Sequence, residues 1–503
     1  MGLRPFDLIL IVAYLIGITL FGLSFRRQQR SLREYFLGGR KIPWWAIALS
    51  IVAAETSILT IISTPGIAYA TNFTFLQLVL GYLLARIAIS LILIPQYFRG
   101  ELFTAYQLMQ RRFGTRIKSV TALIFLGGRA LAEGVRVFAI SIVLSVVLES
   151  LPALGIHVHL SEIQVILVIA FLTLIYTFEG GMSAVIWTDF IQICIYMAGA
   201  VLSLWLLIKG IPGGWSHVVA VAAPQHKFQV FDFSFSWFKP FTFWSGLFGG
   251  MFLTMATHGT DQLMVQRLLS ARSERESKLA LMSSWIVIFV QFSLFLVIGV
   301  ALYVFYQNHP LPPAGRFGRY DRLYPEYIAH HLPVGMAGLL IAAIIAAAMS
   351  NLSAALNSLS STTIMDFYRP HLAPGRTEQH YLWMSRLATV GWTVVLSVVA
   401  YASRNSTSVL EAGLSIISFP FSGLLGIFLL GTLTRKANEI GAIIGMISGV
   451  TTAVVLSRMH IPFTWFVVAG TVVTFGVGYV VSLAFPRGQS QGPEAAHATP
   501  AEM

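Results

Sequence analysis

Long apolar runs recur along almost the whole chain. Crossing roughly 30 Å of hydrocarbon takes about 20 apolar residues in an α-helix, and the runs present predict about thirteen membrane spans. The hydrophobic fraction is 56% and the charged fraction only 11% over 503 residues, whereas soluble proteins have roughly 25% charged residues. We therefore expect an all-α polytopic protein of the plasma (inner) membrane. The predicted spans lie near residues 5–25, 42–70, 74–98, 118–148, 161–178, 183–209, 241–266, 279–307, 334–364, 381–402, 408–433, 438–457 and 461–484.

The net charge of +12 reflects membrane orientation and not a nucleic-acid partner. With the N-terminus outside, the cytoplasmic segments hold 21 of the 33 lysines and arginines, and the outer segments hold nine. Positive residues beside membrane spans mark the cytoplasmic side. We therefore expect an N-out, C-in topology in a lipid bilayer, with no nucleic-acid partner and no obligate protein partner.

A polar strip interrupts one apolar segment, in "AAAMSNLSAALNSLSS" (346–361). Helical spacing places Ala347, Ser350, Asn351, Ser353 and Asn357 on one narrow face. One interpretation is tight packing, because small residues and hydroxyls join helices within membranes. The other is a cation site, since neutral oxygens in a small dehydrated space suit a hard ion such as sodium.

A cation site of neutral oxygens needs a second contributor, usually carbonyls freed where another helix is broken in mid-membrane. The segment "SIVAAETSILTIISTPG" (50–66) places Glu55, Thr56, Ser57 and Thr60 near mid-depth. No glycine or proline occurs at 53–57, so the sequence permits an unwound turn there without demanding one.

Several motifs together resemble the solute/sodium symporter family, which includes sodium/glucose, sodium/proline and sialic-acid transporters. The resemblance implies a leucine-transporter-like fold of two inverted five-helix repeats, at 42–209 and 241–433. It also implies a leading helix at 5–25, an external loop at 210–240 and two accessory helices at 438–484. Residues 486–503 have the composition of a disordered tail. The motifs are "YFLGGRKIPWWAIALSIVAAETS" (35–57), "TAYQLMQRRFG" (104–114), "GGMSAVIWTDFIQ" (180–192), "DQLMVQRLLSARSERESKLA" (261–280) and "AAAMSNLSAALNSLSSTTIMDFYRP" (346–370).

The resemblance also implies a Na+ site. Backbone carbonyls of Ala53 and Thr56 would come from the first broken helix, and Ala347, Ser350 and Asn351 would complete the site. Asn351 departs from the family, which usually has serine or threonine at this position. An amide oxygen can still bind a cation, so the site stays a prediction.

Some members hold a second sodium, for which the resemblance points to Asp189, Ser350 and Ser353. Ala354 stands where a third hydroxyl is expected, which weakens this prediction. The alternative role of Asp189 is a structural carboxylate at the inner end of its helix.

Charged residues within spans are costly and are therefore candidates for function. Arg129, Glu133 and Arg136 share one helical face. They could neutralise one another, or Arg136 could hold a substrate carboxylate through a forked hydrogen-bond pair. Glu55 could instead pair with Arg136 and leave a neutral pocket. An ion-coupling role for Glu55, including proton coupling, stays open.

The remaining pocket candidates lie on other spans. Four come from the segment 244–264, whose glycines permit kinks and close approach. Small residues at 257–258 stand near where sugar-transporting relatives have bulky aromatics, which disfavours a sugar. The substrate candidates outside the arginine cluster and Glu55 are Ser57, Thr60, Thr254, Thr257, His258, Asp261, Ser415 and Ser418.

The expected function is sodium-driven uptake of a small organic solute, carrying a carboxylate, by alternating access. Amino acids, monocarboxylates and sugar acids fit this description. The alternatives are a proton-coupled or neutral-sugar symporter, a passive channel, or a membrane-embedded enzyme. An enzyme is disfavoured because neither HExxH nor GxSxG occurs, and Cys194 and His258 are the only cysteine and histidine in the predicted spans.

Overall fold

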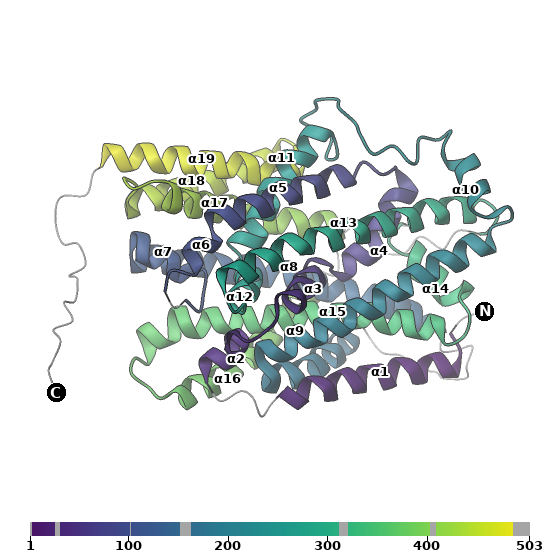
Figure 1. The fold of residues 1–503 in the computed structure, drawn as a ribbon, viewed down its shortest axis with the longest axis horizontal. Coiled ribbons are helices and arrows are strands. Elements are labelled where there is room, and N and C mark those ends of the chain that lie inside the picture. Colours follow the sequence, from purple (N-terminus) through teal and green to yellow (C-terminus); the bar gives the residue numbers. More distant parts are fainter. Residues whose placement is uncertain are drawn as a thin grey trace.

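The structure is a computed structural model that describes residues 3–25, 31–100, 102–150, 162–310, 320–402 and 409–485. The predicted tail at 486–503 lies outside the described residues, as do the side chains of Ser350 and Ser415. Helices make up nearly all of the described chain, most of them running along the long axis of the molecule (Figure 1).

The helices follow the predicted spans closely in order and position. They are α1 (Pro5–Leu23), α2 (Leu32–Leu37), α3 (Trp44–Glu55), α4 (Ile58–Ala70), α5 (Leu76–Ile92), α6 (Ile94–Tyr97), α7 (Tyr106–Phe113), α8 (Thr115–Ser150), α9 (Glu162–Gly210), α10 (Gly214–Ala222), α11 (Phe243–Gly259), α12 (Gln262–Leu269), α13 (Glu274–Phe305), α14 (Leu323–His331), α15 (Met336–Thr362), η4 (Thr363–Leu372), α16 (Glu378–Ala402), α17 (Val409–Leu433), α18 (Glu439–Arg458) and α19 (Phe463–Ala484).

Eight helices in the described ranges are long and apolar enough to cross a membrane unaided, and the bent pair α3 and α4 adds a ninth. Other predicted spans fall short of this measure for local reasons. Helix α5 has only 17 residues, as has α11. Helix α8 carries charged side chains within its apolar stretch. Two of these helices, α8 and α11, hold residues predicted to form the pocket.

One helix joins two predicted spans. The predicted spans 161–178 and 183–209 belong to a single helix, α9, that kinks at Gly181. The φ of Gly181 is 56°, a left-handed value that glycine adopts at little steric cost. The backbone of Gly181 is not helical, so α9 consists of two helical segments that meet at this kink.

The outermost helices of the bundle lie at two opposite edges. Helices α18 and α19 pack against α17 at one edge, and α1 packs against α9 and α15 at the opposite edge (Figure 1). Helix α11 approaches α5 closely, because a Cβ added at Gly250 would collide with the carbonyl of Leu78. The close approach expected from the α11 glycines is confirmed.

Unwound turns separate α3 from α4 and α11 from α12. Helix α3 ends at Glu55 and α4 begins at Ile58, with a bend of 60° between the two segments. Ser57 caps α4 by accepting a hydrogen bond from the Thr60 amide. Helices α11 and α12 are separated in the same way, and Asp261 caps α12 by accepting from the Leu263 amide. Side-chain caps thus stabilise both unwound turns without glycine or proline at the first.

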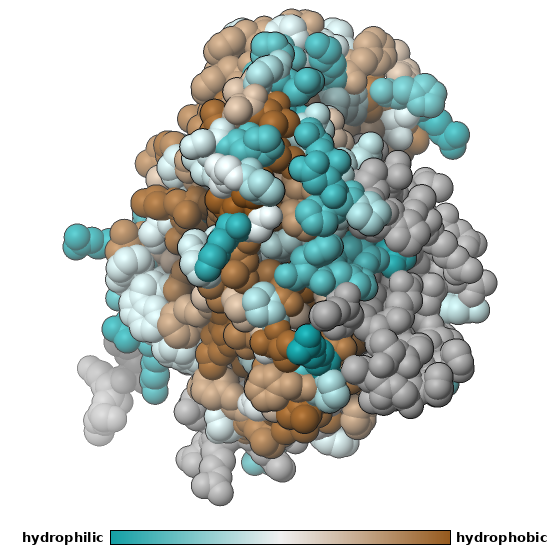
Figure 2. All heavy atoms as spheres, turned by 90° about the vertical axis from the view of Figure 1, so that its right-hand side faces the viewer, coloured by the Kyte–Doolittle hydropathy of each residue, from teal (hydrophilic) through white to brown (hydrophobic). Residues whose placement is uncertain are grey.

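The surface pattern fits a bundle embedded in lipid. Figure 2 shows the end of the molecule at the right of Figure 1, where hydrophilic side chains gather across the face. Hydrophobic side chains flank this band on the side that is drawn in colour.

Candidate functional site

A cavity lies where the two breaks face each other, enclosed by α3, α4, α5, α8, α11, α12, α13 and α17. Most of the predicted substrate residues line it, although they come from separate spans. The predicted residues in its wall are Glu55, Ser57, Thr60, Arg129, Arg136, Thr254, Thr257, His258 and Asp261.

Three predicted residues are not among the described residues of the cavity wall. Glu133 is buried behind the arginines and lines a smaller void beside the cavity. Ser418 is buried and is not among the described residues of the cavity wall, where Ile417 stands instead. The side chain of Ser415 lies outside the described residues. The other lining residues, Ala54, Thr64, Phe75, Tyr82, Leu253, Met264 and Phe292, were not predicted.

The arginines of α8 share two carboxylates. Arg129 lies 3.4 Å from Glu133 and, through Nη1, 3.4 Å from Asp261 of the second break. Arg136 donates from Nη1 to Glu133 Oε1 at 2.6 Å. The side chain of Arg129 is 4% exposed, whereas that of Arg136 is 20% exposed. Arg129 is thus enclosed between two acids, and Arg136 keeps part of its guanidinium toward the cavity.

Glu55 has a different partner from the one considered from sequence. Its Oε2 accepts from Arg86 Nη2 at 2.5 Å and lies 3.3 Å from His258 Nε2. Arg86 is fully buried and also donates from Nε to Ser284 Oγ at 3.1 Å. Glu55 therefore pairs with Arg86, and the alternative pair with Arg136 is not formed.

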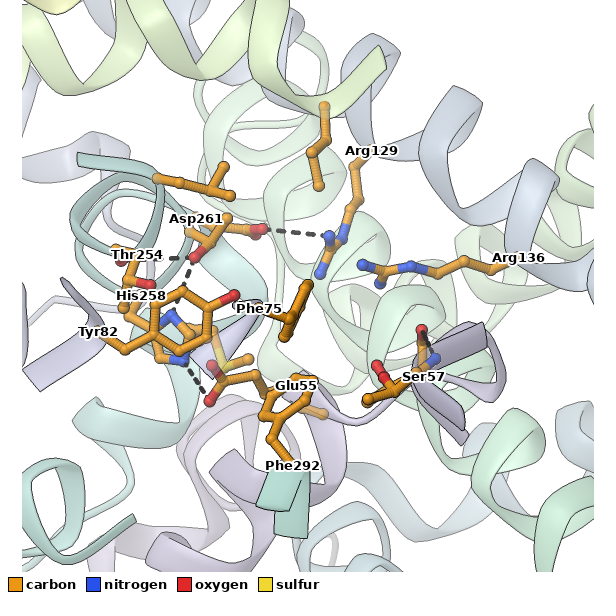
Figure 3. Close-up of a pocket in the computed structure, with 17 residues that line it drawn as sticks. Glu55, Ser57, Phe75, Tyr82, Arg129, Arg136, Thr254, His258, Asp261 and Phe292 are labelled. Carbon is orange, nitrogen blue, oxygen red and sulfur yellow. Dashed lines mark hydrogen bonds and ion pairs between the residues drawn. The ribbon is translucent and has the colours of Figure 1, made fainter. Parts of the chain in front are cut away.

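The cavity has two chemically distinct ends. In Figure 3 the Arg136 guanidinium points into the cavity, and Glu55 and His258 lie on the other side of it. The rings of Phe75 and Phe292 contribute apolar wall between them. Such an arrangement can hold an anionic group at one end and accept hydrogen bonds at the other.

Three of the residues predicted to bind sodium, Thr56, Ala347 and Asn351, meet at the first break. Asn351 Nδ2 donates to the Thr56 carbonyl oxygen at 2.9 Å and to the Ala347 carbonyl oxygen at 3.1 Å. Ala53, one turn before the break, is buried. Carbonyls of α3 and α15 thus converge on one point, while the side chain of Ser350 lies outside the described residues.

Two residues that were not predicted hold Thr56 in place. Its hydroxyl donates to Val52 O at 2.8 Å and accepts from Gln291 Nε2 of α13 at 2.6 Å. Gln291 Oε1 also accepts from Tyr196 Oη at 3.1 Å. This buried network fixes the orientation of the Thr56 carbonyl.

Hydroxyls further along the segment 346–361 bond to backbone carbonyls of their own helix or of a neighbouring helix. Ser358 donates to Ala354 O at 2.9 Å, and Ser360 donates to Ser385 O on α16. Ser353 is fully buried. Tight helix packing therefore accounts for Ser360, and the cation site stays a prediction for the residues near the first break.

Asp189 forms an ion pair with a buried arginine, Arg267. Its Oδ2 accepts from Arg267 Nη2 of α12 at 2.9 Å, and both side chains are fully buried. Ser50 of α3 donates to the same carboxylate oxygen and accepts from Arg267 Nε at 2.8 Å. This triad joins the half-helices α3 and α12 to α9, and Arg267 supplies the positive charge that a second sodium would bring.

Residues 35–449 match the model of the sodium:solute symporter family. The chain belongs to this family. It is 29% identical to the sodium/sialic acid symporter NanT of Aliivibrio fischeri, over 95% of this chain and 93% of that protein. It is 26% identical to sodium-coupled monocarboxylate transporter 2 of Mus musculus, over 86% of this chain and 69% of that protein.

A solved structure gives the same result for the fold. It shows a Na+-coupled sialic acid symporter in a substrate-bound outward-open state, with a TM-score of 0.85 and 28% identity. The alignment covers 97% of this chain and 100% of that one. The protein is therefore a sodium-coupled solute symporter, a multi-pass membrane protein with a leucine-transporter-like fold, and not an enzyme.

Proposed function

We propose that this symporter imports a small carboxylate-bearing solute together with sodium by alternating access. The observation that carries the proposal is Arg136, which is held within the membrane by one hydrogen bond to Glu133 and faces the cavity with the rest of its guanidinium. A guanidinium in a partly dehydrated site favours a bidentate carboxylate.

The residues opposite Arg136 in the cavity indicate which carboxylates would fit. Glu55 and His258, with the hydroxyls of Thr254 and Thr257, offer acceptors and donors for a hydroxyl or ammonium group. We therefore favour hydroxy acids, sugar acids and amino acids over simple fatty acids. Two relatives bear names that specify sialic acid and monocarboxylates, and both are carboxylates.

For the coupling ion, we propose the site formed by Ala53, Thr56, Ala347, Ser350 and Asn351. The convergence of the Thr56 and Ala347 carbonyls at one nitrogen supports it. We propose one sodium per cycle, because Arg267 already neutralises the carboxylate that a second ion would need. A second ion at Asp189, Ser350 and Ser353 would have to displace that guanidinium.

A thermal-shift screen of the purified protein tests the proposal. Each candidate carboxylate is added in sodium and, at equal ionic strength, in choline. Binding raises the melting temperature by mass action, so the proposal predicts stabilisation by a carboxylate in sodium and a much smaller effect in choline. Stabilisation by neutral sugars alone, or equal stabilisation in choline, contradicts it.

A further inference from the structure

The amide of Asn351 occupies the point on which the predicted sodium-binding carbonyls converge. We propose that this amide is an internal substitute for the coupling cation. Its nitrogen bridges the carbonyls of Thr56 and Ala347 when sodium is absent, and the amide turns over to offer Oδ1 when sodium binds. The inference rests on the proposed sodium site and concerns a step that this site alone does not specify.

The hydrogen-bond geometry supports a substitute for a cation. Two carbonyl oxygens from different helices both accept from one nitrogen, at 2.9 Å and 3.1 Å. An amide nitrogen carries two hydrogens, one for each acceptor. The Thr56 carbonyl lies at the broken helix, where a buried carbonyl without a partner is costly in a membrane, whereas the Ala347 carbonyl lies within the continuous helix α15. The nitrogen therefore satisfies the same oxygens that a cation would satisfy.

The oxygen of the Asn351 amide, Oδ1, is buried without a hydrogen-bond donor among the described residues. Asn351 is 3% exposed, and no described residue donates to its Oδ1. A buried acceptor without a donor costs free energy. Turning the amide would bring this oxygen beside the two carbonyls, where three oxygens repel one another unless a cation lies among them. Sodium bound among these oxygens therefore removes the free-energy cost of leaving Oδ1 buried without a partner.

The turn needs little extra space. The nitrogen and oxygen of a side-chain amide are similar in size, and a small void lined by Ser57, Ala348, Glu133 and Arg136 adjoins Asn351. Arg136 lines both this void and the substrate cavity. The substitute therefore sits within one side chain of the proposed carboxylate site.

Two functional consequences follow. Sodium must displace two hydrogen bonds, so its affinity is lower than at a site with a hydroxyl in this position. The carrier without sodium is also stabilised, because its carbonyls keep a partner. Both effects suit a symporter that must release sodium into the cell and return without it.

The test compares Asn351→Ser with the parent and with a matched control, Asn357→Ser. Asn357 is another buried asparagine of α15, and its Nδ2 contacts Met182 Sδ rather than the broken helix. The readout is the sodium concentration that gives half of the maximal thermal shift, titrated against choline without solute. Removing the two hydrogen bonds that sodium must displace, with partial compensation by the serine, tightens sodium binding by about tenfold. Asn357→Ser leaves it unchanged.

A second variant keeps the test decisive if Asn351→Ser is poorly folded. Asn351→Asp preserves the shape and removes both donors, so it melts lower than the parent in choline and regains stability in sodium. If the parent responds to sodium and neither Asn351 variant binds it more tightly, the substitute is refuted while the proposed sodium site stands. If the parent and both variants ignore sodium, the proposed site and this inference both fail.

Discussion

Removing the Arg136 guanidinium should selectively weaken the binding of carboxylates. A charge-assisted hydrogen bond contributes about 1.5–3 kcal/mol, which corresponds to a loss of about 10- to 150-fold in affinity. Arg136 is 20% exposed, so water screens it only in part, and the upper half of this range is expected. The variant Arg136→Ala is compared with the parent by calorimetric titration in sodium, using the carboxylate identified in the screen.

A neutral analogue separates charge recognition from general damage. The parent should bind the primary amide of the same solute about as weakly as Arg136→Ala binds the carboxylate, and the variant should not distinguish the two. Arg136→Lys keeps the charge without the fork and should fall between them. Equal carboxylate affinity in the parent and Arg136→Ala, with both proteins folded, would refute the assignment of the substrate carboxylate to Arg136.

Three further predictions concern stability and are checked by thermal unfolding. Glu55→Gln leaves a fully buried arginine without its counter-charge, and Asp189→Asn does the same to Arg267. Each should cost about 3–5 kcal/mol, and an unchanged melting temperature would show that the pair does not hold its helices together. Outside the predicted spans, His330 donates from Nδ1 to the Glu326 carboxylate, and this hydrogen bond raises the pKa of His330 above 6.5. The stabilisation from this pair is complete below pH 6.5 and is lost as the pH rises through the raised pKa. His330→Gln should remove this dependence, worth less than about 1 kcal/mol because the histidine is partly exposed; a pH profile identical to that of the parent would contradict it.

The sequence was most informative where the physical signal is local. Hydropathy predicts each span because every span must separately satisfy its backbone in lipid. Charged residues within spans identify the cavity, since Arg129, Arg136 and Asp261 would not be tolerated without partners. The break at 56–57 was permitted by the sequence but not demanded by it, because its stability comes from the Ser57 cap and the Thr56 contacts.

The sequence does not show which polar side chains pair with one another across helices. The pairing of Arg86 with Glu55 depends on the packing of α5 beside α13 and the first break. Gln291 and Arg267 were not among the predicted site residues, and each acts through a contact with another helix. The partner of such a residue is set by the approach of two helices and not by spacing along one.

Solute accumulation in proteoliposomes tests the central claim most directly. One sodium entering down about 100 mV contributes about 2.3 kcal/mol, and a tenfold sodium gradient adds about 1.4 kcal/mol. One coupled ion can therefore support accumulation of a zwitterionic amino acid by up to about 500-fold, whereas a singly charged carboxylate anion cancels the charge of the sodium and is accumulated by up to about tenfold through the sodium gradient alone. The account predicts accumulation well above equilibrium in a sodium gradient, none when choline replaces sodium, and a higher sodium requirement in Ser350→Ala. Equal accumulation in choline, or uptake that never exceeds equilibration in sodium, would contradict it.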